Sequence, residues 1–440
     1  MQRSWKSISI GIASIAGYLR SLGYDVVILD SRLEALSAKA LARKIVAFKP
    51  QYVGYTAFTE EIFDAASIAA EVKKCDSKVT NIIGGCHASA IPEDTLQEFS
   101  GFDIAVVGEG ELPLGRILAG ESWNDIPGVV TRDKAGVPVI SPGNKIVPQL
   151  DNLPMPAWDS FAIKQYRTPL FIELARACPF QCTFCFKTVG RQVRYKSPER
   201  ILDELEYCVK QLGISHLYFS TNGTWPLARE HALRVCDGIL SRKLKIRWST
   251  STRVDCVDQE LLVLMRRSGC DFIDFGIESA SKDIILTCKK QTKPELFEQV
   301  IRQCHELGFD IKLDFLLGLP QETPETLGET YNFIKKIRNY STIANFAVLI
   351  PFPGTEIFSM ALRGENGLRL LSKNWRLYTK QTGVLLERDT LSTEELKRWQ
   401  AKMYRAYYLW SLRKPFQILM SKNARELISL NRYISLFKSI

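Results

Sequence analysis

The 440-residue sequence has no run of eighteen apolar residues, so we expect no helix that crosses a membrane. It also lacks a repeat of fixed period and any low-complexity segment, which argues against repeat arrays, collagen-like chains and disordered chains. Its eleven cysteines are too dilute to suggest a disulfide framework. Five of them are expected to be buried apolar side chains: Cys75, Cys208, Cys236, Cys270 and Cys304. We therefore expect a reduced, cytoplasmic protein.

Composition is ordinary for a globular chain, with 46% hydrophobic and 24% charged residues, and the length predicts two or three domains. The formal net charge is +10, and residues 401–440 hold eight basic residues against one acid. The rest of the chain is nearly neutral. The apolar start resembles a secretory signal, but its pattern continues into Tyr18-Leu19-Arg20, so we interpret it as the first helix of a folded domain.

Residues 1–121 alternate helix patterns with short apolar strands, which predicts an α/β domain with a doubly wound parallel sheet. The expected helices are 8–22, 33–48 and 63–74, and the expected strands are 26–29, 52–56, 79–83 and 104–107. Ligands of such sheets bind at the carboxyl ends of the strands. Three segments lie at such ends and are expected to form one rim: Thr56–Thr59, Gly84–Ser89 and Gly108–Glu111.

The remaining chain divides into a proline-rich linker at 122–168, a second α/β domain at 169–390 and a basic helical C-terminal segment at 391–440. Six strands and five helices alternate in the second domain, which predicts a partial (β/α)6 barrel with its chemistry at the C-terminal mouth. The expected strands are 170–174, 216–220, 246–251, 272–276, 311–317 and 346–350. The expected helices are 198–212, 227–240, 258–268, 293–307 and 323–338.

The most specific motif is Cys178-Pro-Phe-Gln-Cys182-Thr-Phe-Cys185, which follows the first predicted barrel strand. Thiolates at this spacing in a loop are able to converge on one four-iron cluster and leave one iron with an open position. An open iron binds an amino acid through its amine and carboxylate. The alternatives are a zinc site or three buried thiols. A structural zinc site normally has four ligands, and no nearby Cys or His pair completes this one.

This motif resembles the radical S-adenosylmethionine (SAM) superfamily, and its surroundings resemble the cobalamin-dependent branch. The similarity continues through Ser251-Thr-Arg253-Val-Asp255, Phe275-Gly-Ile-Glu278-Ser279, Phe315-Leu-Leu-Gly318-Leu-Pro320 and Pro351-Phe-Pro-Gly-Thr355. Two features depart from the family pattern. Ala177 stands where many relatives have glycine, and Ser220–Trp225 lacks the acidic residues that often follow the second barrel strand.

The resemblance implies specific roles at the barrel mouth. Cys178, Cys182 and Cys185 would ligate a [4Fe-4S] cluster, and the backbone at Phe184 would lie near the adenine of SAM. Glu278 would accept hydrogen bonds from SAM, and Arg253 would offer a bidentate fork to a carboxylate. Two alternatives stay open: Glu278 and Arg253 form a salt bridge at the rim, or the segment from Gly318 to Pro320, otherwise an adenine contact, is only a strand-ending turn.

The N-terminal domain is similar to the cobalamin-binding domain of the same branch, although it opens at the first helix and is expected to lack the first strand. The implied cobalamin-binding residues are Thr56, Thr59, Gly84, Gly85, His87, Ser89, Gly108, Glu109 and Gly110. The Asp-x-His-x-x-Gly pattern of domains with a histidine cobalt ligand is absent. His87 is therefore interpreted as bracing its loop.

The resemblance implies an enzyme that uses a [4Fe-4S] cluster, SAM and cobalamin to methylate an unactivated carbon through a 5′-deoxyadenosyl radical. The alternatives are an oxidative cyclase or rearrangement enzyme without methyl transfer, and a noncatalytic sensor of cobalamin or SAM. Expected partners are a small-molecule or natural-product substrate and an electron donor such as flavodoxin or ferredoxin. No nucleic-acid-reading motif is present. The basic, aromatic segment Arg405–Phe416 has two interpretations, a contact with an anionic membrane and a helix packed on the barrel.

Overall fold

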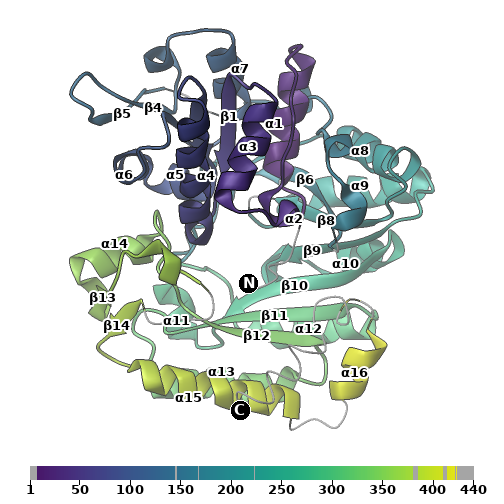
Figure 1. Ribbon diagram of the computed structural model, residues 1–440. Helices are drawn as coiled ribbons and strands as arrows, with labels where there is room; N and C mark the ends of the chain where they lie inside the picture. The colour runs from purple at the N-terminus through teal and green to yellow at the C-terminus, as the bar shows by residue number, and fades with distance from the viewer. Residues whose placement is uncertain are drawn as a thin grey trace.

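The computed structural model describes residues 7–143, 146–166, 168–221, 223–379, 385–409, 414–421 and 423. These residues form an N-terminal α/β domain, drawn in purple at the top of Figure 1, and a larger α/β barrel domain with a helical C-terminal segment below it. Among the described helices, none combines the length and the apolar content that a membrane crossing requires.

The N-terminal sheet has a parallel half that matches the prediction. Its strands are β1 (Tyr52–Thr56), β2 (Thr80–Gly84) and β3 (Ile104–Val106), which lie side by side in that order. The helices of this domain are α1 (Ile10–Ser21), α3 (Ala38–Ala47), α4 (Ile62–Cys75), α5 (Gly85–Ala90), α6 (Pro92–Glu98) and α7 (Glu111–Leu118). The carboxyl ends of β1, β2 and β3 therefore form the expected rim.

Two predictions near the start of this domain are wrong. Residues 26–29 are not assigned as a strand and pair with no described strand. In a 2-1-3-4-5 sheet the second strand pairs only with the first, and among the described residues no strand precedes α1 to offer that pairing. The helix expected at 33–48 is divided into α2 (Ser31–Glu34) and α3, because Ala35 adopts the left-handed conformation with φ 50°.

The segment expected to be a linker contributes to the sheet. β4 (Val129–Arg132) pairs antiparallel with β3, and β5 (Pro138–Ile140) pairs antiparallel with β4. The rest of the segment has only short 3-10 turns, and the Ala157 amide donates to the Ala13 carbonyl of α1 at 2.8 Å. The sheet is thus mixed, and residues 122–168 both extend it and attach α1 to the barrel.

The barrel sheet has the six parallel strands that the sequence predicts, in the order β12-β11-β10-β9-β8-β6, with the short β7 (Arg194–Tyr195) antiparallel beyond β6. The strands are β6 (Leu170–Arg176), β8 (His216–Thr221), β9 (Arg247–Thr252), β10 (Cys270–Glu278), β11 (Asp310–Leu317) and β12 (Ile343–Val348). The helices are α8 (Pro198–Lys210), α9 (Arg229–Ser241), α10 (Gln259–Arg267), α11 (Lys282–Thr287), α12 (Glu295–Glu306) and α13 (Pro324–Ile337). Of these, α11 is not predicted from the sequence.

Alternation along the strands separates the two faces of the barrel sheet. In β11, Ile311, Leu313, Phe315 and Leu317 are buried beneath the helices. The alternate residues Lys312 and Asp314 face the other side and are only partly buried. This period-two pattern leaves a polar inner face of the sheet. The mouth of the barrel is formed by the carboxyl ends of the same strands.

The chain beyond the last barrel strand packs on both domains. Its described elements are α14 (Glu356–Arg363), β13 (Leu368–Leu370), β14 (Leu386–Arg388), and then, within the C-terminal segment, α15 (Thr393–Tyr404), a π-helical turn at Arg405–Leu409 and α16 (Lys414–Met420). Trp375 and Tyr378 share a core with Ala57 and Ile83 of the N-terminal domain. Residues 352–378, which follow the last barrel strand, therefore pack against the strand ends of the N-terminal domain.

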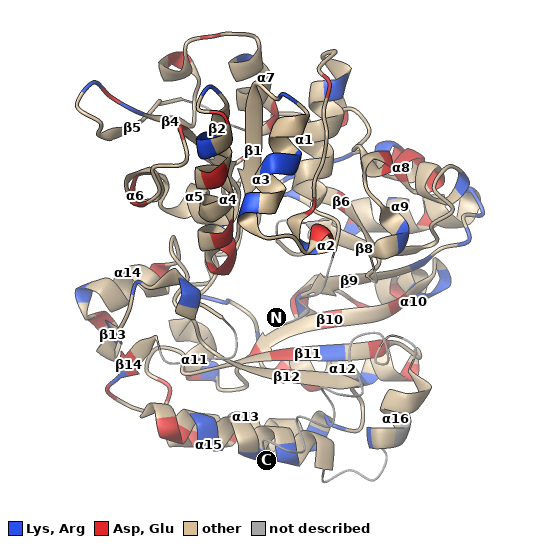
Figure 2. Cartoon of the chain, viewed as in Figure 1, with Lys and Arg blue, Asp and Glu red and all other residues tan. Residues whose placement is uncertain are grey.

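The described part of the C-terminal segment matches the interpretation of a helix packed on the barrel. Tyr407, Tyr408 and Lys414 are buried. Residues 410–413 and most of those after 421 lie outside the described residues. Figure 2 shows Lys and Arg interspersed with Asp and Glu over the outer helices, including α8, α10 and α15.

Candidate functional site

The three predicted cluster cysteines lie together in the loop that follows β6. Cys178 is buried, Cys182 is half-buried and Cys185 is exposed, and all three are free thiols. The loop is fixed by hydrogen bonds from the Thr183 amide to the Cys288 carbonyl (3.1 Å) and from the Cys185 amide to the Cys182 carbonyl (3.2 Å). At the end of β8, a Cβ on Gly223 would lie 2.5 Å from the Cys178 Cβ, so glycine allows this close approach.

The donor set of this loop fits an iron–sulfur cluster. Burial raises the pKa of Cys182, and it raises the pKa of Cys185 to about 11, while Lys290 and Arg253 act on Cys182 in the opposite direction. Metal binding would release these protons, because thiolates are the ligands. In the described chain, no three Cys, His, Asp or Glu side chains converge closely enough for a single metal ion.

Arg253 and Glu278 lie at the same mouth but do not pair with each other. Arg253 donates to both carboxylate oxygens of Asp255, at 2.8 and 2.6 Å, and to the Lys290 carbonyl at 2.5 Å. Its guanidinium also stacks on Phe180, 3.6 Å from the ring centre. Glu278 instead accepts from Lys290 Nζ at 3.1 Å. Arg253 and Glu278 thus each form a salt bridge at the rim, with Asp255 and Lys290 respectively, and not with each other.

Sequence reasoning missed Lys290, Asp255 and Phe180. Lys290 is buried and also donates to the Gly276 carbonyl at 2.5 Å. It follows α11, a short helix whose sequence has no clear periodicity, so no signal marked it. Glu278 adopts φ 65°, a conformation that is uncommon for a side chain other than glycine and that clusters at functional sites.

The turn from Gly318 to Pro320 is braced from two sides. The Gly318 amide donates to Glu322 (2.5 Å), and its carbonyl accepts from Arg388 of β14 (2.8 Å). A Cβ on Gly318 would lie 2.7 Å from the Arg388 Nε. Burial raises the pKa of Glu322 to about 8 and lowers that of Arg388 to about 10. Leu319 of this turn and Phe184 belong to the same hydrophobic cluster.

The N-terminal rim is built by glycines and by buried polar contacts. Gly85 has φ 86°, and a Cβ there would lie 2.5 Å from the Thr56 Oγ1. Ser89 Oγ accepts from the Gly108 amide at 2.9 Å, which joins the ends of β2 and β3. Positive φ explains why glycine stands at 85 and 108. The backbone segments at the ends of β1, β2 and β3 therefore pack closely against one another.

His87 braces this rim from inside the domain. It is fully buried, its Nδ1 lies 3.3 Å from the Thr59 Oγ1, and its ring meets Trp375 edge-on at 5.2 Å. Its Nε2 has no hydrogen-bond partner among the described residues. Burial lowers the pKa of His87 to about 4, so the ring is neutral at physiological pH. These contacts match the interpretation of a loop-bracing histidine.

Of two further residues predicted in the rim, Glu109 faces the barrel domain, whereas Gly110 packs against α1 of its own domain. Glu109 is buried and forms ion pairs with Arg176 and Arg194 of the barrel domain. A Cβ on Gly110 would lie 2.8 Å from the Ile15 Cδ1 of α1. Glu109 thus connects the β3–α7 loop to the barrel domain.

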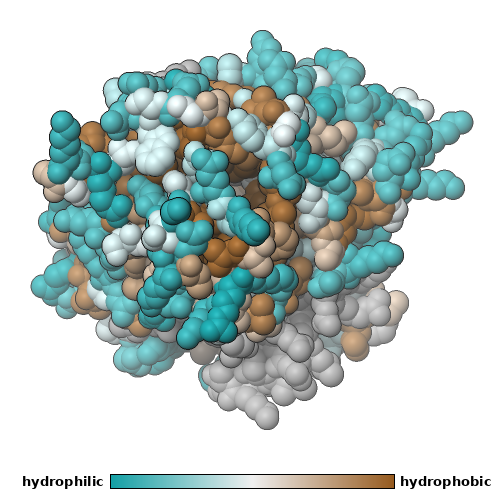
Figure 3. Space-filling view, turned by 45° about the horizontal axis from the view of Figure 1, so that its top comes forward, coloured by the Kyte–Doolittle hydropathy of each residue, from teal (hydrophilic) through white to brown (hydrophobic). Residues whose placement is uncertain are grey.

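The two rims meet. Cys86 of the N-terminal rim lies 3.5 Å (Sγ to Oγ1) from Thr188 of the cysteine loop. A Cβ on Gly354 would lie 2.4 Å from the Phe186 ring and 3.0 Å from the Ala90 Cβ, so three segments converge at this glycine. Figure 3 shows apolar side chains gathered in a hollow at the centre of one face of the molecule.

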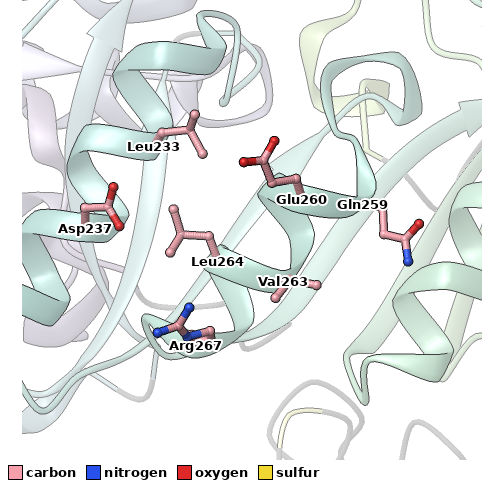
Figure 4. A pocket seen from close by; sticks show the side chains of 7 residues that line it. All are labelled: Leu233, Asp237, Gln259, Glu260, Val263, Leu264 and Arg267. Atoms are coloured by element: carbon pink, nitrogen blue, oxygen red, sulfur yellow. The ribbon is translucent and has the colours of Figure 1, made fainter.

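The inner face of the barrel below the mouth is charged. Lys312 Nζ donates to Asp274 (2.7 Å) and to Asp314 (2.5 Å), and Tyr218 donates to Ser251 (2.7 Å). Asp274 and Glu278 both lie on the partly buried face of β10, four residues apart, so the charged layer lies below the mouth. A separate groove of about 610 Å³ lies between α9 and α10 on the outer face, lined by Leu233, Asp237, Gln259, Glu260, Val263, Leu264 and Arg267 (Figure 4). It does not include the cysteine loop.

Comparison with known proteins agrees with this geometry. Residues 172–334 match the model of the radical SAM superfamily, and residues 6–118 match the B12 binding domain. An uncharacterised methyltransferase of Pyrococcus horikoshii, PH0819, is 30% identical over 91% of this chain and 87% of its own length. The anaerobic magnesium-protoporphyrin IX monomethyl ester cyclase of Rubrivivax gelatinosus is 28% identical over 90% of this chain and 73% of its own.

Solved structures share the fold. The radical SAM methyltransferase TsrM from Kitasatospora setae, with cobalamin and a [4Fe-4S] cluster bound, matches with a TM-score of 0.74 at 18% identity, over 91% of this chain and 86% of its own. The cobalamin-dependent SAM radical enzyme OxsB matches with a TM-score of 0.76 at 17% identity, over 98% and 69%. The chain belongs to the radical SAM superfamily, in the cobalamin-dependent branch that carries an N-terminal B12-binding domain.

Proposed function

We propose that this protein methylates an unactivated carbon of a small molecule, using SAM, a [4Fe-4S] cluster and cobalamin. The supporting observation is the contact between the two rims at Cys86 and Thr188. This contact puts the cobalamin-binding side of the N-terminal domain against the cysteine loop. A substrate at the mouth would then face both cofactors.

The cofactors carry the difficult chemistry, namely homolytic cleavage of SAM and transfer of a methyl group. In the overall reaction one C–H bond of the substrate is replaced by C–CH3. One SAM loses its methyl group to become S-adenosylhomocysteine, and a second SAM becomes methionine and 5′-deoxyadenosine, which carries the hydrogen from the substrate. Two electrons enter, supplied by a donor such as flavodoxin or ferredoxin.

The chain's own residues bind and orient these groups. The three cysteines would hold the cluster, and their number leaves one iron free to bind the amino acid part of SAM. Arg253 and Lys290 are buried cations beside Cys182, suited to a carboxylate, and Glu278 is suited to an amine or a hydroxyl. Phe184 and the turn at Gly318 would flank the adenine. The polar barrel interior is suited to a substrate that carries hydrogen-bonding groups.

The similarity to the Rubrivivax cyclase supports a second candidate, a radical reaction without methyl transfer. Anaerobically reconstituted protein should be incubated with methyl-deuterated SAM and a strong reductant, and S-adenosylhomocysteine and 5′-deoxyadenosine should be quantified. We expect both products, with label in the protein-bound cobalamin. Formation of 5′-deoxyadenosine without S-adenosylhomocysteine would favour the cyclase, and formation of neither would contradict both proposals.

A further inference from the structure

A buried network of charged side chains joins the two domains beside the first cluster cysteine. Its centre is Arg176, the last residue of β6 and two residues before Cys178. Arg176 donates to Glu111 at 2.7 Å and to Glu173 at 3.0 Å, and its Nη1 lies 3.2 Å from Glu109. Its side chain is 4% exposed. One guanidinium thus contacts two acids of the N-terminal domain and one of the barrel.

Further contacts extend the network to α1, to residue 147 and to β7. Arg194 of β7 forms a second ion pair with Glu109 and donates to the Val147 carbonyl at 2.6 Å. Ser14 of α1 donates to Glu111 at 2.5 Å. α1, the β3–α7 loop, residue 147 and the first barrel strand are therefore held by one set of polar contacts.

Stability alone does not explain this network. Three carboxylates and two guanidiniums are buried there, and each side chain is at most 8% exposed. Removing such charges from water costs about as much free energy as their attraction returns, so apolar residues of similar size would often be equally stable. What directional ion pairs add is a fixed geometry, since a planar guanidinium accepts its partners only in defined positions.

One end of the network lies next to the cysteine loop, and the other lies next to the N-terminal rim. Cys178 follows Arg176 after one residue, and Glu109 follows Gly108, whose amide donates to Ser89 of the N-terminal rim. We propose that Arg176 is a positioning residue, which holds the cobalamin-binding rim at a fixed distance from the cluster loop. This inference rests on the proposed function. Its consequence is that Arg176 controls how efficiently the methyl group of SAM reaches the cobalt.

The first test uses the protein without cofactors. Arg176→Met and Glu111→Gln, from opposite sides of the interface, should be compared with Arg20→Met, which breaks an exposed ion pair between α1 and Asp159. Hydrogen–deuterium exchange of α1 and α7 should be at least 10-fold faster in both network variants than in wild type, and unchanged in Arg20→Met. Unchanged exchange in both network variants would overturn the proposal.

The second test uses the reconstituted holoenzyme, reduced in the presence of SAM. Formation of 5′-deoxyadenosine needs only the barrel domain. Formation of S-adenosylhomocysteine needs the two domains in their correct relative position. We expect the ratio of S-adenosylhomocysteine to 5′-deoxyadenosine to fall at least 10-fold in Glu111→Gln and Arg176→Met, with iron content retained in Glu111→Gln. Arg176→Lys, which keeps the charge but loses the fork, should give an intermediate ratio.

Three outcomes separate the possibilities. An unchanged ratio in Glu111→Gln would overturn the positioning role. A parallel loss of iron and of both products in both variants would also overturn it, since the network would then only support the cluster loop. If wild-type protein formed no S-adenosylhomocysteine, the proposed function would fail, and the exchange experiment would still decide whether Arg176 holds the domains together.

Discussion

Lys290 Nζ lies 3.1 Å from the Glu278 Oε1 and donates to the Gly276 carbonyl, so a buried ammonium holds the acid that ends β10. The same ammonium acts on the pKa of Cys182. Lys290 therefore links the cysteine loop to the acid proposed to contact SAM. A residue with no sequence signal thus lies at the centre of the mouth.

Replacing Lys290 should weaken SAM binding without loss of the cluster. In Lys290→Met, Glu278 loses its ion-pair partner, and the site loses one cation that could bind the carboxylate of SAM. We expect the Kd for SAM to rise at least about 10-fold, which corresponds to about 1.4 kcal/mol. Lys289→Met is the matched control, because Lys289 is exposed and pairs with Glu356. An unchanged Kd in Lys290→Met, measured anaerobically on protein with full iron content, would contradict this role.

Each cluster cysteine should be indispensable for iron binding. Anaerobic reconstitution of wild-type protein should give about four irons per chain, with the broad visible absorption of a [4Fe-4S] cluster. Cys178→Ala, Cys182→Ala and Cys185→Ala should each bind little iron. Cys304→Ala is the control, since Cys304 is buried in the barrel core and its loss should affect only stability. A variant of the loop that kept full iron content would remove that cysteine from the ligand set.

His87 should make stability sensitive to acid. Its pKa is about 4 in the folded protein and about 6.5 in the unfolded chain, so the folded state holds the neutral ring. The stabilisation is complete above pH 6.5 and is lost as the pH falls toward 4. Between pH 7 and 5.5 the loss should be about 1 kcal/mol. Denaturant unfolding at both pH values should show that loss in wild type and a smaller one in His87→Gln. Equal losses would mean that His87 titrates normally.

Gly354 should tolerate a methyl group less well than another glycine of similar backbone conformation. Gly354 (φ 79°) and Gly364 (φ 70°) are both left-handed, so alanine at either position carries backbone strain of about 1–2 kcal/mol. A Cβ at Gly364 meets nothing within 4 Å, whereas one at Gly354 would lie 2.4 Å from Phe186. Gly354→Ala should therefore be clearly less stable than Gly364→Ala, and it should lose activity by displacing the cysteine loop. Equal Tm values would show that Phe186 moves freely.

Patterns of neighbouring residues predicted those features of the fold and of the site that depend on neighbouring residues. The spacing of Cys178, Cys182 and Cys185 and the period-two strands around them indicated the cluster loop and the six barrel strands, because both depend on neighbours in sequence. The strand at 26–29 failed because an apolar run becomes a strand only when a partner is present. Lys290 and the partners of Glu109 could not be predicted, since side chains far apart in sequence determine those contacts.

The C-terminal segment illustrates the same limit, because its tyrosines complete the open edge of the barrel. Tyr408 donates to the Ala344 carbonyl (2.7 Å) and accepts from the Ala344 amide (3.1 Å), while Gln400 donates to the Phe346 carbonyl (2.6 Å). Edge strands expose such groups, and a sheet needs them covered. Sequence composition showed only a basic, aromatic tail.

Tyr408→Phe should therefore destabilise the barrel although it removes a single oxygen. Both backbone groups of Ala344 are left without this partner in a buried setting, at a cost of about 2 kcal/mol. Tyr331→Phe is the control, because the Tyr331 hydroxyl forms no hydrogen bond to the described residues while its ring keeps its contacts with Lys335 and Lys402. Denaturant unfolding should show the loss only in Tyr408→Phe. If both variants were as stable as wild type, water would be completing the β12 edge in place of the tyrosine.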